Sequence, residues 1–190
     1  MDTNERAIFH ARLRTCAHAL DQEGIGALGR LFDLTAHRGV RYALALTNHQ
    51  DDAEDAFQAA MVRIALHPRR LAMAGHPWAY LLRIVRNEVL NILRRRRPRT
   101  QLVCPDEIEA ADNPLLDEDE TRWYVQRSLR RLPSEQAEVV VLKIWEEMTF
   151  AEIAEMLGES PNTVASRYRY ALDKLTRPLR PLMNEVRYER

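Results

Sequence analysis

The sequence predicts an all-α protein made of two small helical domains joined by an acidic flexible linker. Gly and Pro are sparse within long stretches of Ala, Leu, Arg and Glu. Apolar residues recur at helical spacing, and little of the chain alternates in the way of a strand. An abrupt change of charge near residue 100 divides the chain. We expect domains at 1–98 and 117–182, a linker at 99–116 and a tail at 183–190.

Composition excludes several classes of protein. Of the 190 residues, 46% are hydrophobic and 29% charged, so a core is expected and wholesale disorder is not. Equal numbers of basic and acidic residues, 28 each, exclude a uniformly basic protein but allow local patches. There is no run of about 18 apolar residues and no secretory signal, so we expect no membrane span and a cytoplasmic location.

The first half is predicted to hold four helices. The first covers residues 5–20, and the second runs from Leu28 to Leu46 with a bend near Gly39. Residues 48–52 supply the N-cap of a third helix. A loop between His67 and Pro77 then leads to the fourth helix, from Trp78 to about Arg96.

The charge changes sign after the fourth helix. A run of arginines at 94–97 and 99 is followed by eight acids and no basic residue between Asp106 and Glu120. Pro98, Pro105 and Pro114 interrupt the region from the arginine run to Glu120. Such a composition is extended, self-repelling and poor in core-forming residues, which is typical of a linker.

Residues 149–175 read as a helix-turn-helix. Thr149 and Glu152 form a capping box, and Gly158 stands where a left-handed residue ends a helix. Ser160 is predicted to cap the next helix, with Pro161 at its first position. Upstream, one helix is expected to end at Leu132-Pro133 and another to be capped by Ser134.

The last of these helices has two faces. Val164, Tyr168 and Leu172 are predicted to point inward. The outward face holds Asn162, Thr163, Ser166, Arg167 and Arg169. Arg, Asn and hydroxyl side chains suit base edges and phosphates in the major groove, so this face favours DNA binding. The alternative is an ordinary surface hairpin of two helices with a solvated polar face.

Three stretches together resemble a bacterial RNA polymerase sigma factor of the extracytoplasmic-function (ECF) type. Residues 52–58, Asp-Ala-Glu-Asp-Ala-Phe-Gln, match the signature of region 2.2 in that family. Residues 78–87 resemble its −10-contacting helix, and residues 132–175 resemble region 4. The order and spacing of the three motifs make the resemblance specific. It implies a region 2 bundle, a region 4 helix-turn-helix and a function in promoter recognition and transcription initiation.

The resemblance also implies partners and site residues. Core RNA polymerase would be bound through its β′ clamp helices by Asp52, Glu54, Asp55 and Gln58, and through its β flap by region 4. The alternative for the four residues is a solvated first turn. The −10 element would be bound by Tyr80, Arg83, Arg86, Asn87, Arg94 and Arg95, with a flipped base captured by the loop at 67–77. The −35 element would meet the outward face of the last helix.

Several points stay open at this level. Ala165, Tyr170 and Leu172 stand where the family often has basic residues, which predicts either an unusual base preference at the −35 element or a weaker contact with it. The linker could mimic nucleic acid in the polymerase channel or serve as a plain spacer. An anti-sigma partner is common in the family, although no residue identifies one.

No cofactor, metal site or enzymatic activity is predicted. The six histidines lack HExxH spacing, and the chain has no Gly-rich phosphate loop and no GxSxG. Two alternatives to a sigma factor remain: a stand-alone helix-turn-helix transcriptional regulator, and an adaptor that binds a regulator.

Overall fold

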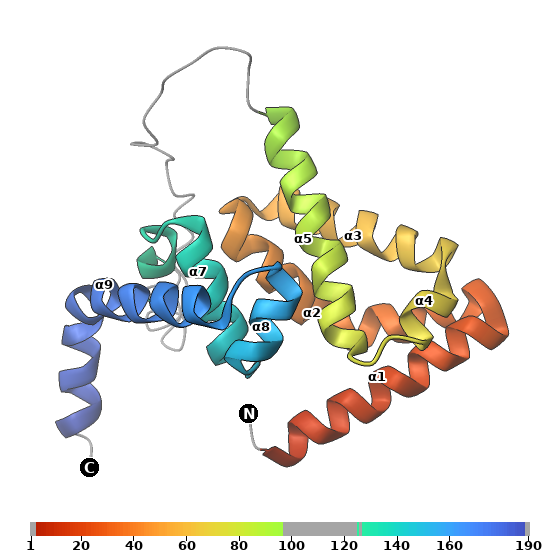
Figure 1. The fold of residues 1–190 in the computed structure, drawn as a ribbon, viewed down its shortest axis with the longest axis horizontal. Coiled ribbons are helices and arrows are strands. Elements are labelled where there is room, and N and C mark those ends of the chain that lie inside the picture. The colour runs from red at the N-terminus through yellow and green to blue at the C-terminus, as the bar shows by residue number, and fades with distance from the viewer. Residues whose placement is uncertain (1–2, 97–124, 126, 189–190) are drawn as a thin grey trace.

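A computed structural model describes residues 3–96, 125 and 127–188, with side chains to Thr176. The elements named below are helical, and the described ranges contain no strand (Figure 1). The first bundle comprises α1 (Thr3–Glu23), η1 (Gly24–Ala27), α2 (Leu28–Thr47), α3 (Gln50–Leu66), α4 (Pro68–Ala72) and α5 (Pro77–Arg96). The second comprises α7 (Ser134–Val140), η2 (Val141–Trp145), α8 (Phe150–Leu157) and α9 (Pro161–Tyr188). The all-α prediction with two helical domains is confirmed. The predicted linker lies outside the described residues.

The first bundle is built on α2, α3 and α5. Tyr42, Phe57 and Leu81 are among its fully buried side chains. α1 crosses this bundle and packs against α2, α4 and α5 (Figure 1). Burial of these apolar side chains is the main force that holds the helices together.

α2 is one continuous helix from Leu28 to Thr47, so the chain stays helical through Gly39. Gly39 is fully buried where α3 crosses α2. A Cβ at Gly39 would lie 2.3 Å from Cε2 of Phe57. The glycine therefore permits close approach of two helices and does not break one.

The cap and the loop predicted on either side of α3 are right only in part. His49, within the predicted residues 48–52, is the N-cap of α3, although its side chain makes no cap hydrogen bond. Asn48 ends α2 in the left-handed conformation, with φ of 54°. Its amide donates to the carbonyl of Leu44, which satisfies the end of α2. The predicted loop between His67 and Pro77 contains the short helix α4, which Pro68 begins.

The second bundle contains the expected helix-turn-helix and an unexpected π-helical turn. Ser134 is the first residue of α7 and makes no side-chain cap. α7 then passes into the π-helical turn η2. Glu147 follows with φ of 54°, and Lys143 Nζ donates to the carbonyl of Met148 at 3.0 Å. Both features lie in the connection between η2 and α8. α9 extends to Tyr188, past the end expected at residue 182.

The two bundles pack against each other. α2 contacts α7 and η2, and α5 contacts α8. In Figure 1 α7 and α8 lie beside α2 and the first turns of α5. None of the described helices is long and apolar enough to cross a bilayer.

Candidate functional site

The acidic start of α3 divides into an exposed part and a buried part. Glu54, Asp55 and Gln58 are exposed, as expected for a docking surface. Asp52 is only 4% exposed. Its carboxylate pairs with Arg96 at 2.6 Å and lies 4.0 Å from His49. The expectation that Asp52 shares the exposed face is therefore wrong, because this carboxylate fastens the start of α3 to the end of α5.

The exposed face of α3 continues beyond the acidic motif. Val62 and Leu66 are 59% and 69% exposed. They follow Asp55 and Gln58 at spacings of three and four, so the four side chains form one stripe on the side opposite the core. We call Asp55, Gln58, Val62 and Leu66 the α3 stripe. Sequence reasoning missed its apolar half, although the spacing was available to find it.

α5 presents a second exposed stripe. Arg83, Asn87 and Arg94 are exposed and share one face with the half-buried Tyr80. Arg95 is also exposed, on the neighbouring side of the helix. The structure thus brings together five of the six side chains predicted to contact the −10 element.

Arg86, the sixth, faces the second bundle instead. Its Nε donates to Glu138 Oε1 at 2.8 Å. The same oxygen accepts from the hydroxyl of Tyr42 at 2.6 Å. Burial disfavours the charged guanidinium, but the Glu138 carboxylate outweighs it and raises the pKa of Arg86. Burial, reinforced by Glu138, raises the pKa of Tyr42 well above its usual value.

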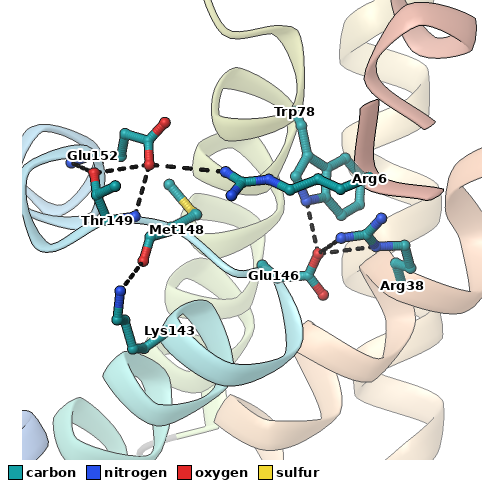
Figure 2. A network of polar contacts seen from close by, with 8 residues as sticks. All are labelled: Arg6, Arg38, Trp78, Lys143, Glu146, Met148, Thr149 and Glu152. Carbon is teal, nitrogen blue, oxygen red and sulfur yellow. Dashed lines mark hydrogen bonds and ion pairs between the residues drawn. The ribbon is translucent and has the colours of Figure 1, made fainter. Parts of the chain in front are cut away.

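A second buried carboxylate, Glu146, also joins the two bundles. It is 1% exposed. Oε2 accepts from Arg38 Nε at 2.9 Å, from Arg38 Nη2 at 2.5 Å and from the indole of Trp78 at 2.8 Å. Oε1 accepts from Arg41 Nη2 at 3.0 Å. Figure 2 shows Glu146 facing Trp78 and Arg38 across the seam, the contact between the two bundles.

The helix-turn-helix has the local geometry that the sequence predicts. The Thr149 hydroxyl accepts from the Glu152 amide at 3.2 Å, and the Thr149 amide donates to Glu152 at 2.7 Å, which completes the capping box. Burial works to raise the pKa of Glu152, but the amide and the hydroxyl of Thr149, which both donate to its carboxylate, and the charge of Arg6 lower it overall. Gly158 ends α8 with φ of 71°, and Ser160 accepts from the Thr163 amide at 3.0 Å.

The outward face of α9 is assembled as expected, with one internal ion pair. Asn162 and Arg169 are exposed, and Thr163, Ser166 and Arg167 are half-buried. Arg167 Nη2 pairs with Glu159 at 3.1 Å. A carboxylate therefore holds the guanidinium that would meet DNA.

The inward face of α9 differs from the prediction at one position. Val164 is fully buried and Tyr168 packs on Phe150, with ring centroids 5.5 Å apart. Leu172 is 38% exposed, and Ala171 and Leu175 take its place in the core. An α-helix has 3.6 residues per turn, so residues spaced four apart move gradually away from the buried face. The core therefore continues at positions 171 and 175 and not at 172.

Both halves match known protein families. The family model for sigma-70 region 2 matches residues 31–99, and that for sigma-70 region 4 matches residues 122–175. The chain is 34% identical over 155 residues to the ECF RNA polymerase sigma factor SigM of Mycobacterium tuberculosis, covering 81% of this chain and 78% of the relative. It is 33% identical over 149 residues to the RNA polymerase sigma-E factor of Streptomyces avermitilis, covering 74% and 78%.

Solved structures share the fold. The sigma factor RpoE of Bartonella quintana, in complex with the anti-sigma factor NepR, gives a TM-score of 0.61 at 21% identity and covers 78% of this chain and 94% of its own. CnrH, in complex with the cytosolic domain of CnrY, gives 0.62 at 22% identity and covers 88% and 97%. The fold and the two family models define a sigma factor of RNA polymerase. The chain belongs to the sigma-70 family, in its ECF class.

Proposed function

We propose that this ECF sigma factor binds core RNA polymerase and directs initiation at promoters through three exposed helix faces. The α3 stripe docks on the β′ clamp helices, and the second bundle binds the β flap. The exposed face of α5 binds the opened −10 element, and the outward face of α9 enters the major groove at −35. Sigma factors are not enzymes, so the chemistry of RNA synthesis belongs to the polymerase.

One observation carries the assignment of surfaces. Two helices of the same chain, one in each matched region, present a polar and basic face to solvent: Arg83 and Asn87 on α5, and Asn162 and Arg169 on α9. Arg and Asn are the side chains that pair best with phosphates and base edges. Two separate DNA elements require two such faces.

The α3 stripe suits a protein partner better than DNA. Asp55 would repel phosphates, whereas Val62 and Leu66 offer apolar area to a helical surface. Acidic side chains beside an apolar strip favour a partner whose surface is basic at its rim. The polymerase is therefore assigned to this face.

The family assignment supports a proposed location and a proposed regulator. We place the protein in the cytoplasm, beside the polymerase. An anti-sigma factor is a further proposed partner, since the structural relative RpoE was solved in complex with the anti-sigma factor NepR.

Run-off transcription with purified core polymerase and genomic fragments tests the proposal. We expect defined transcripts that require both the core enzyme and this chain. A stand-alone helix-turn-helix regulator would instead bind a duplex fragment specifically without core polymerase. Sequence-specific duplex binding by the free chain, without any dependent transcript, would contradict the sigma-factor assignment.

A further inference from the structure

Two ion pairs join α3, the helix proposed to bind the polymerase, to α5, the helix proposed to bind the −10 element. Asp52 of α3 pairs with Arg96 of α5 at 2.6 Å, and Arg63 of α3 pairs with Glu88 of α5. α3 supplies the acid to the first pair and the base to the second. We call these four residues the clasp. The two pairs lie more than two turns apart on both helices, so the clasp holds α3 and α5 together at two separate points.

The clasp lies at the rim of the apolar contact between α3 and α5. Its two acids are buried, since Asp52 is 4% exposed and Glu88 is 9% exposed. The side chains of Arg96 and Arg63 keep 55% and 60% of their surface in solvent. A buried carboxylate requires a cationic or hydrogen-bonding partner, so each acid fixes the position of the arginine that meets it.

The Asp52–Arg96 pair positions the last turn of α5. Arg96 follows Val89 by two turns on the same side of α5, so its guanidinium reaches Asp52 at the end of the buried face. Its neighbours Arg94 and Arg95 are exposed and are assigned to the −10 element by the proposed function. Asp52 therefore sets where these two arginines stand relative to α3.

The Arg63–Glu88 pair positions the middle of α5 in the same way. Glu88 directly follows Asn87, an exposed side chain of the proposed −10 surface. Arg63 holds one carboxylate oxygen of Glu88 from α3, and the amide of Asn91 donates to the other at 3.5 Å. A small rotation of α5 about its axis would carry Asn87 away from a base edge, and the pair at Glu88 opposes that rotation.

We propose that Arg63 and Arg96 are positioning residues for −10 recognition, which set the rotation and register of α5 against α3 and do not themselves contact DNA. This rests on the proposed function, which places the polymerase on α3 and the −10 element on α5. Because the polymerase holds α3 in the initiation complex, the clasp fixes the side chains that read DNA relative to the polymerase. An arginine that contacts a phosphate raises affinity for every sequence, whereas a positioning arginine acts on the preference for the correct one.

The test measures −10 discrimination by holoenzyme assembled from core polymerase and the full-length chain. This quantity is the ratio of two affinities: for a promoter fragment obtained by run-off transcription, and for the same fragment with its −10 element scrambled. Arg96→Gln and Arg63→Gln should each lower the ratio about three- to tenfold, with −35 discrimination unchanged. Arg95→Gln, the matched variant beside Arg96, should instead weaken binding to both fragments alike. It should also lower the slope of log affinity against log salt concentration by about one.

Variants of the partner acid separate positioning from contact with phosphate. Asp52→Asn should lower −10 discrimination as Arg96→Gln does, although the loss of an acid would not weaken a phosphate contact. The double variant Asp52→Asn/Arg96→Gln should lose no more than either single variant, as expected for one interacting pair. Arg96→Lys keeps the charge and should restore part of the discrimination. Circular dichroism should show the same helicity for all of these chains.

Three results would overturn the positioning role. The first is that Arg96→Gln behaves like Arg95→Gln, with a uniform loss of affinity and a lower salt slope. The second is that the effects of Asp52→Asn and Arg96→Gln simply add. The third is an equal loss of −35 discrimination, which would indicate a general weakening of the fold. A wild-type holoenzyme that failed to distinguish the intact from the scrambled −10 element would count against the proposed function instead.

Discussion

Asp52 and Asp55 stand three residues apart on α3, and they differ completely in what they contact. Asp52 lies at the edge of the buried face and pairs with Arg96, whereas Asp55 points away from the core into solvent. The chemistry of the two side chains is the same. They differ in their angle around the helix axis and in the position of α5, which lies beside Asp52. For this reason Asp52 is a structural carboxylate, whereas Asp55 is available to a partner.

Gly39 gives the sharpest single-residue prediction of stability. Gly39→Ala should lower the free energy of unfolding by about 1–3 kcal/mol, because the new methyl group overlaps the ring of Phe57. Urea denaturation followed by circular dichroism measures the change. Gly29→Ala is the matched control on the same helix, where a Cβ meets nothing within 4 Å, and it should be neutral or stabilising. Equal effects of the two substitutions would contradict the close packing at Gly39.

Arg167 gives the corresponding prediction for DNA recognition. Arg167→Ala should weaken holoenzyme binding to a promoter that carries its −35 element by about 1–3 kcal/mol, the usual contribution of an Arg–base contact. Glu159→Gln should have the opposite effect, because the carboxylate that pairs with Arg167 also repels phosphates. Filter binding to promoters with intact and scrambled −35 elements measures both.

Arg12→Ala, which removes an exposed arginine of α1, controls for net charge in that experiment. If Arg167→Ala weakened binding to the scrambled promoter as much as to the intact one, Arg167 would be a general phosphate contact and not a reader of the −35 sequence.

At the scale of elements, the helices carry function on faces that packing leaves free. The core of α9 uses Val164, Ala171 and Leu175, which leaves Asn162 and Arg169 in solvent. α3 buries Ala56, Phe57 and Ala60 on one side and leaves the α3 stripe on the other. Each surface is therefore rigid because its opposite face is packed.

The α3 stripe makes a prediction about affinity for the polymerase. Asp55→Ala/Gln58→Ala should weaken core binding on the order of tenfold, the loss expected when a charge-assisted hydrogen bond is removed. Adding Leu66→Ser should weaken it further, since an apolar contact is lost as well. Competition with a labelled sigma factor for core enzyme measures the affinity. Asp33→Ala removes an exposed acid of α2 and should leave the affinity for core polymerase unchanged. A loss of affinity as large as that of the double variant would mean that net charge governs docking.

At the scale of the whole molecule, the seam between the bundles is polar and buried. Its hydrogen bonds join residues 52 to 108 positions apart in the chain, such as Arg86 with Glu138 and Arg38 with Glu146. Such an interface differs from the apolar interiors of the two bundles, because its stability depends on the protonation of a few groups.

The raised pKa of Tyr42 makes the stability of the closed molecule sensitive to alkaline pH. Burial and Glu138 keep the phenol protonated in the folded chain above the pH at which it ionises when exposed. This contribution is fully present below the ordinary tyrosine pKa of about 10 and is lost as pH rises above it. Urea midpoints measured across this range should fall more steeply for wild type than for Tyr42→Phe. Parallel curves would show that Tyr42 does not carry the dependence.

The sequence by itself determined what depends on neighbours along the chain. Helix type, the Thr149–Glu152 capping box, the left-handed Gly158 and the polar face of α9 all follow from residues within about one turn of each other, so local rules were sufficient. The resemblance to sigma factors likewise rested on the order of short motifs, and the family models confirm it.

Only the tertiary structure decided which polar groups were buried. Glu138 lies in α7 and Glu146 directly follows η2, and nothing near them in sequence marks their partners on α2 and α5. The role of Gly39 depends in the same way on Phe57, eighteen residues later. Pairing across such separations is set by how whole helices pack, and a local pattern of residues carries no information about that geometry.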